Sequence, residues 1–88
     1  MNQAIQFPER EEWRADLQAV CFPAMVNGIV LTCAIKGEIL AYRFGGDTPE
    51  QWLEAFQANR WDIEEEAGLL LHEQQEDDQG WLWLSCSK

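Results

Sequence analysis

The sequence lacks any apolar run of about 18 residues, the length at which a helix can cross a bilayer, so we expect no membrane span. It also lacks the apolar segment of a secretory signal near its start, where Glu9, Arg10, Glu11 and Glu12 stand instead. Its three cysteines are odd in number and widely spaced. Without an export signal, we expect a cytoplasmic protein whose cysteines are reduced thiols.

Motifs that carry chemistry are missing as well. No CxxC, HExxH or EF-hand pattern occurs, and His72 is the single histidine, placed among acids rather than beside a cysteine. Runs such as Glu64–Glu66 are typical of a solvated surface, and a paired-carboxylate mechanism needs a cleft that so short a chain hardly provides. The sequence therefore predicts no catalytic residue, no metal ligand and no cofactor, and hence a protein that is not an enzyme.

Positive charge is scarce. Six Lys and Arg residues stand against sixteen Asp and Glu, giving a net charge of −10. Residues 45–80 carry eleven of the acids and one base, Arg60. A field of this sign repels phosphates and anionic lipids, which argues against nucleic-acid and membrane-surface partners. A basic protein partner is allowed, although a solvated face that keeps the chain soluble accounts for the acidity more simply.

Apolar residues make up 47% of the 88 residues, which is enough for one modest core. We therefore expect a single domain over residues 1–88. The strongest strand signal is Asn27-Gly28, a preferred type I′ pair between two apolar runs. A two-residue loop predicts a hairpin over residues 20–35 in which Val26 opposes Ile29 and Val20 opposes Ile35.

This register separates two faces, because directly opposed residues point the same way. The expected core face is wholly apolar: Val20, Phe22, Ala24, Val26, Ile29, Leu31, Cys33 and Ile35. The other face holds Cys21, Pro23, Met25, Val30, Thr32 and Ala34, and is less polar than a solvated face. Cys21 and Cys33 fall on opposite faces, so they can share neither a zinc ion nor a disulfide.

Residues 48–75 form a predicted acidic helical arm. Thr48, Pro49 and Gln51 give it an N-cap, a proline at the first helical position and a capping box. Its apolar stripes, Trp52, Leu53 and Phe56, then Ile63, Ala67, Leu70 and Leu71, fit one helix or two. We favour a long helix with a kink or short break near residues 59–62, and we expect the stripes to cover the Phe22, Leu31 and Cys33 side of the hairpin. Gly68 indicates close packing or simple tolerance.

The remaining segments are short. Residues 4–7 read as an edge strand stopped by Pro8, and residues 9–16 as a turn or a single helical turn packed by Trp13. Residues 39–44 fit a helix better than a strand. Residues 81–86 read as a last strand with two apolar faces, which places it well inside the sheet or gives it an exposed aromatic side.

Together these elements predict an α+β fold: a small antiparallel sheet of about four strands, packed on one face by a long or kinked helix from the C-terminal half. Residues 19–24, 41–53 and 80–84, with Asn59-Arg60, Ile63 and Ala67 between them, resemble the YrdB-like proteins, a family of small bacterial proteins classed as a domain of unknown function. The resemblance covers nearly the whole chain. It implies a small α+β fold with an antiparallel sheet and supplies no activity and no site residue.

The aromatic residues suggest a function. Five tryptophans in 88 residues is a high number, and Trp81 and Trp83 are expected on the same face as Cys21 and Met25. Exposed Trp and Met are typical of interfaces, although large rings also complete a thin core. We predict a non-catalytic interaction module that forms a homodimer or binds another protein.

Arg60 is a further interaction candidate. It is placed to pair with Glu64 four residues on and so join the two halves of the arm, or to hold an anion. The alternative function is therefore a binder of a small molecule or anion, held by Arg60, Arg43 or Gly45-Gly46.

Overall fold

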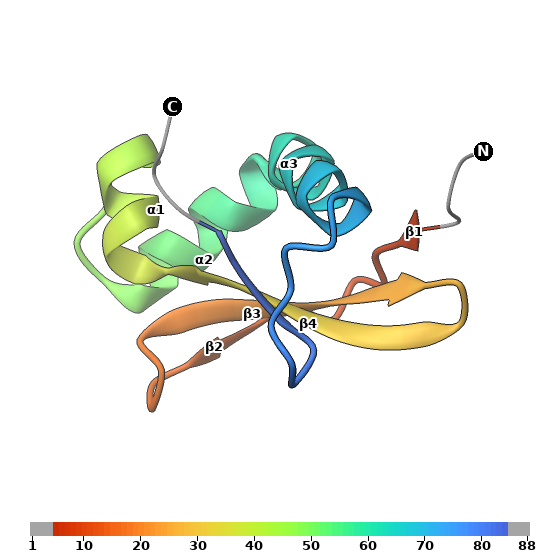
Figure 1. Ribbon diagram of the computed structural model, residues 1–88. Helices are drawn as coiled ribbons and strands as arrows, with labels where there is room; N and C mark the ends of the chain where they lie inside the picture. The colour runs from red at the N-terminus through yellow and green to blue at the C-terminus, as the bar shows by residue number, and fades with distance from the viewer. Residues whose placement is uncertain (1–4, 85–88) are drawn as a thin grey trace.

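A twisted hairpin forms the centre of the structure. The computed structural model describes residues 5–84 (Figure 1). In it β3 (Ala19–Val26) and β4 (Ile29–Lys36) pair antiparallel in the predicted register, from Val26 opposite Ile29 to Val20 opposite Ile35. Asn27 and Gly28 have φ angles of 53° and 85°, the left-handed values that a type I′ turn requires. The predicted hairpin is confirmed.

Three shorter strands complete a five-stranded sheet. β1 (Ile5–Gln6) and β2 (Glu12–Arg14) both pair antiparallel with the outer edge of β3, and β5 (Trp81–Leu84) runs parallel to β4. The predicted α+β class is confirmed, but the sheet is mixed rather than antiparallel throughout. Three helices carry the chain back to the start of β4, so β5 re-enters in the same direction. Ala4 and Cys86, included in the predicted first and last strands, lie outside the described residues.

Pro23 explains why two short strands share one edge. Thr32, opposite Pro23, donates its N–H to the carbonyl of Gly80 at 2.9 Å and so turns its backbone toward β5. Pro23 and Thr32 are therefore a non-hydrogen-bonded antiparallel pair, and in such a pair the two backbones face away from each other. The backbone of Pro23 thus faces the outer edge of β3. A proline there has no N–H to donate to a neighbouring strand. β1 accordingly ends opposite Met25, and β2 begins opposite Cys21.

β2 corrects one prediction, because residues 12–14 form a strand rather than a turn or a helical turn. Glu12 and Arg14 point to one face and Trp13 to the other, opposite Val20. The Trp13 ring packs on Trp52 with centroids 5.5 Å apart. The pairing energy with β3 and this ring contact outweigh the low strand propensity of a charged segment.

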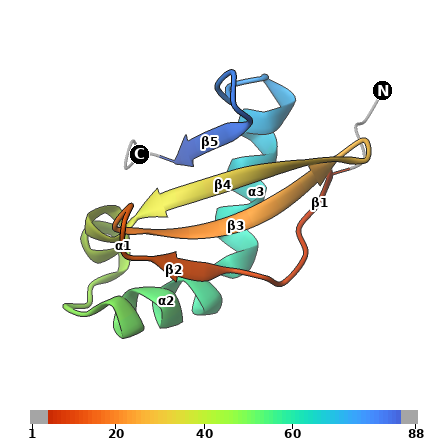
Figure 2. The ribbon, with the colours of Figure 1, turned by 90° about the horizontal axis from the view of Figure 1, so that it is seen from below.

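All three helices, α1 (Gly37–Phe44), α2 (Pro49–Ala58) and α3 (Arg60–His72), lie over one face of the sheet (Figures 1 and 2). The predicted helix at residues 39–44 and the predicted cap are confirmed. Thr48 Oγ1 accepts from the Gln51 N–H at 3.2 Å, and Gln51 Oε1 accepts from the Asp47 N–H at 2.6 Å. The arm is broken at Asn59, within the predicted interval.

The core lies between the helices and the predicted face of the hairpin. Its largest fully buried side chains are Phe22, Phe56, Ile35, Leu40, Ile63, Leu82, Val20 and Cys33. Ile29, at the hairpin tip, was assigned to the core face but is 64% exposed, because the helices do not reach over the tip. None of the helices within residues 5–84 combines the length and the apolarity that crossing a bilayer requires.

Candidate functional site

The face of the sheet opposite the helices is left uncovered by them, and we call it the open face (Figure 2). Strand alternation and register place on it Glu12, Arg14, Ala19, Cys21, Pro23, Met25, Val30, Thr32, Ala34, Lys36, Trp81 and Trp83. Val30 is 62% and Trp83 41% exposed, while Met25, Pro23 and Trp81 are half-buried. Four of the predicted interaction residues, Trp81, Trp83, Met25 and Cys21, therefore do share one face.

Trp81 and Trp83 form a stacked pair at the β5 side of this face. Their ring centroids are 5.8 Å apart at an interplanar angle of 17°, and Lys36 Nζ lies 5.8 Å from the Trp83 centroid. Of the alternatives for the last strand, an exposed aromatic side is the one observed. A rigid aromatic pair with a cation above it offers both apolar and charged contacts to a partner.

Cys21 forms the floor of this surface rather than a contact point. It is 4% exposed and packs with Ala19 and Ala34 beneath Trp81 and Leu17. Burial raises the pKa of the Cys21 thiol, and on the core side burial raises the pKa of Cys33 to about 12. Cys21 and Cys33 are free thiols on opposite faces, as the register predicted.

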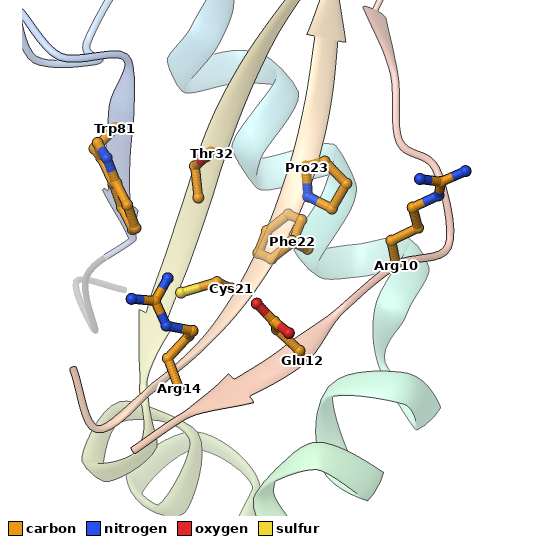
Figure 3. Close-up of a pocket in the computed structure, with 8 residues that line it drawn as sticks. All are labelled: Arg10, Glu12, Arg14, Cys21, Phe22, Pro23, Thr32 and Trp81. Carbon is orange, nitrogen blue, oxygen red and sulfur yellow. The ribbon is translucent and has the colours of Figure 1, made fainter. Parts of the chain in front are cut away.

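A shallow depression of about 230 Å³ crosses the strands beside Trp81 (Figure 3). Trp81, Thr32 and Pro23 lie side by side on three neighbouring strands, and Arg10, Glu12 and Arg14 border them. Arg14 donates two hydrogen bonds to Asp16, at 2.8 and 3.1 Å, in an ion pair whose two side chains are both exposed to water. The depression thus has an apolar base and a charged margin with two arginines and one glutamate.

A second depression of about 190 Å³ lies on the other side of the tryptophan pair, bordered by Leu17, Asp77, Gln79, Trp81 and Trp83. Asp77 is the acid on this margin, and it is engaged by the backbone. Its Oδ1 accepts from the N–H groups of Gln79 and Trp81, both at 2.9 Å. Trp81 therefore forms a wall common to two depressions, each large enough for a side chain.

Arg60 lies elsewhere, on the helical side of the molecule. It donates to Glu11 at 2.6 Å and to the Pro8 carbonyl at 3.3 Å, and it pairs with Glu64 at 2.8 Å. The predicted i,i+4 pair is confirmed. Burial alone raises the pKa of Glu11, but hydrogen bonds from Arg60 and Gln57 outweigh it and hold that pKa below its usual value.

The other proposed anion-binding groups are also engaged. Arg43 pairs with Glu66 at 2.9 Å, and the Gly45 N–H donates to the Ala41 carbonyl at 2.8 Å. A depression of about 370 Å³ next to Arg60 is bordered by Glu9 and Glu64, which repel an anion. Within residues 5–84, no three His, Cys, Asp or Glu side chains gather where they could hold a metal ion, and His72 is exposed.

Sequence reasoning missed the charged margin of the open face. From the sequence, Arg10, Arg14 and Lys36 were assigned to no surface. The alternation of Glu12, Trp13 and Arg14 is a strand pattern, and it was the available signal. The role of Asp77 was also missed, although Asp followed by Gly three residues later is typical of a type I turn.

Fold and surface define a small α+β protein with helices on one face of a mixed sheet and an aromatic open face on the other. The chain belongs to the family described as "Protein of unknown function (DUF1488)", whose model matches residues 5–84. The resemblance to the YrdB-like proteins is confirmed: the chain is 70% identical over 84 residues to "Uncharacterized protein YrdB" from Shigella flexneri and from Escherichia coli (strain K12), covering 96% of this chain and 99% of each relative.

A solved structure supports the fold. The crystal structure of a protein of unknown function from the DUF1488 family of Shewanella loihica PV-4 superposes with a TM-score of 0.87 at 35% identity, covering 96% of this chain and 94% of that one.

Proposed function

We infer that this protein is a cytoplasmic, non-catalytic interaction module that binds a protein through its open face. The observation that carries the proposal is the stacked Trp81–Trp83 pair, with Trp83 41% exposed, on a sheet face that the helices leave uncovered. Large aromatic side chains in this setting are the residues that most often dominate binding energy at protein interfaces.

The anion-binding alternative has less support. Arg43 and Arg60 already hold carboxylates, so binding a small anion would require breaking an ion pair whose members are largely shielded from water. The two depressions on the open face, about 230 and 190 Å³, fall below the roughly 300 Å³ at which small-molecule sites usually begin. A surface that takes individual side chains of a partner suits these dimensions better.

Site-specific photo-crosslinking in the cell tests this function. A photoreactive amino acid at Val30, 62% exposed on the open face, is compared with the same amino acid at Leu69, 63% exposed on α3. We expect a discrete adduct from Val30 that is absent or much weaker from Leu69, and a replacement of Trp83 by Ala should reduce it. Equal adducts from both positions, or none from Val30, would refute the proposal.

The mass of the adduct separates the two forms of the module. An adduct of twice the chain mass identifies a homodimer, and sedimentation velocity of the purified protein then has to show a dimer that Trp83→Ala weakens. An adduct of another mass identifies a different protein, and the purified chain should then sediment as a monomer.

A further inference from the structure

We propose that the open face binds an acidic, extended peptide segment of another protein, with an apolar side chain against the Trp81–Trp83 pair and carboxylates on Arg10, Arg14 and Lys36. This inference rests on the proposed function and names the chemistry of the partner.

The partner docks on the face of the sheet and not on an edge. At the β5 edge, Asp77 donates its N–H to the Trp81 carbonyl at 2.8 Å and accepts the Trp81 N–H at 2.9 Å, so the outward backbone groups of Trp81 are used. At the other edge, β3 is occupied by β1 and β2, and Pro23 between them has no N–H. Strand addition, the common way for a peptide to join a sheet, is thus disfavoured, because the Trp81 end of β5 is occupied and the opposite edge is formed by strands of only two and three residues.

Positive charge is concentrated beside the open face. The described residues include five bases, and three of them, Arg10, Arg14 and Lys36, border the open face. Glu12, Asp16 and Asp77 are the acids on the margins of the same face. The other two bases, Arg43 and Arg60, are paired with glutamates on the helical side, where most of the eleven acids of residues 45–80 lie. In a chain of net charge −10, the open face is where bases equal acids in number.

This distribution selects an acidic partner. A second copy would bring the same three bases against one another and add a second charge of −10, both of which oppose association. A nucleic acid could stack on the tryptophans, but its phosphates would be repelled by the rest of the chain. A short acidic segment meets the bases while staying small enough to avoid the acidic helical side.

The shape of the open face suits an extended segment. The two depressions share Trp81 as a wall, so neighbouring side-chain sites lie along the face. An extended segment directs alternate side chains to one side, which lets it fill both sites with one residue between them. Cys21 and Ala34 at the floor are fully packed, so the surface is preformed and needs little ordering on binding.

Panning a phage-displayed library of random 12-residue peptides on the immobilised full-length protein tests the proposal. Enriched peptides are then synthesised and titrated, with tryptophan fluorescence as the signal. We expect enrichment of Asp and Glu around an aromatic or aliphatic residue. Arg14→Glu combined with Lys36→Glu should weaken binding roughly tenfold or more, and raising the salt from 50 to 500 mM should weaken it further.

Three variants control the result. Glu12→Gln should tighten binding by removing the acid of the first depression, and Trp83→Ala should weaken it. Trp61→Ala, which removes the same side chain from the 72% exposed position on α3, should leave binding unchanged. Circular dichroism establishes that each variant is folded before its affinity is interpreted.

Several outcomes would overturn the inference. Enriched peptides that are neutral or basic would show that the face does not select acids. The same conclusion would follow if their affinity were unchanged by Arg14→Glu combined with Lys36→Glu. If those peptides still require Trp83, the interaction function stands while the acidic partner is rejected. Tighter binding of a single-stranded oligonucleotide of 12 nucleotides, tested in the same titration, or no enrichment above the Trp83→Ala variant, also rejects it.

Discussion

Asp77 and Trp81 are joined by two hydrogen bonds that run in opposite directions: the Asp77 N–H donates to the Trp81 carbonyl, and Asp77 Oδ1 accepts the Trp81 N–H. The same oxygen also accepts from the Gln79 N–H. The loop before β5 therefore occupies the exposed edge of its own strand at Trp81. Unpaired groups at a sheet edge are a template for pairing with other chains, and at Trp81 these groups are already bonded.

Asp77→Ala removes the Oδ1 acceptor for two backbone donors. We expect it to lower the free energy of unfolding by about 1–2 kcal/mol, since each such bond contributes roughly 1 kcal/mol. Asp77→Asn keeps an acceptor oxygen and should lose less than half as much. Urea denaturation measures both, and equal losses for Ala and Asn would show that the hydrogen bonds to Oδ1 are not the cause.

Phe56 joins the broken arm to the sheet. It is fully buried, and its ring centroid lies 4.9 Å from that of Phe22. Phe56→Ala should lower the free energy of unfolding by about 3–5 kcal/mol, and Phe56→Leu by distinctly less, because Leu leaves a smaller cavity. Trp61→Ala, five residues on but 72% exposed, should change it by no more than about 0.5 kcal/mol. Similar losses at the two positions would contradict this core assignment.

The contrast between these elements indicates what the sequence could predict. The hairpin was predictable residue by residue, because Asn27-Gly28 fixes the turn and an eight-residue strand on each side permits one register that buries a wholly apolar face. The caps and the break in the arm follow from local chemistry at Thr48, Gln51 and Asn59. The helices were therefore also accessible from sequence.

β2 and the parallel β5 were not accessible in the same way. The alternation within three residues is too short to distinguish a strand from a turn, and the formation of β2 depends on β3 and on Trp13 meeting Trp52, 39 residues later in the chain. The direction of β5 depends on how three helices pack. The charged margin of the open face was missed for the same reason, since β2 carries Glu12 and Arg14 to it.

The Arg60 network makes stability depend on pH. In the folded protein the pKa of Glu11 is held below its usual value. Ionised Glu11 therefore contributes its full stabilisation at pH values above the usual pKa, and this contribution is lost as the pH falls through the lowered pKa. Glu11→Gln should therefore lower the free energy of unfolding near pH 7 by about 1–2 kcal/mol and flatten its decline between roughly pH 5 and pH 3. Urea titrations across that range measure this, and parallel curves for the two proteins would refute it.

Cys21 and Cys33 should differ in their rates of alkylation, because Cys21 is covered by Trp81 and Leu17 whereas Cys33 lies in the core. At pH 8 the Cys33 thiol, with a pKa of about 12, is ionised to roughly one part in 10⁴ and is fully buried. In a Cys86→Ser background, we expect Cys33 to resist alkylation until the protein unfolds. Trp81→Ala should accelerate alkylation of Cys21 and leave Cys33 unchanged. Mass spectrometry of the digested protein assigns the site, and equal acceleration at both cysteines would indicate general loosening.

Two glycines in helices should respond to the same substitution in opposite directions. At Gly68, within α3, an added Cβ would meet no atom within 4 Å. Close packing therefore does not require the glycine, and the helix simply tolerates it. Gly68→Ala should raise the free energy of unfolding by about 0.5–1 kcal/mol through helix propensity. At Gly37, the first residue of α1, the added Cβ would lie 2.6 Å from Trp52 Cε3 and 3.0 Å from Trp13 Cη2, so Gly37→Ala should lower the free energy of unfolding. Thermal and urea unfolding measure the change in the free energy of unfolding for both variants. A stabilised Gly37→Ala variant would show that the packed Trp13 and Trp52 rings move aside for the added methyl group.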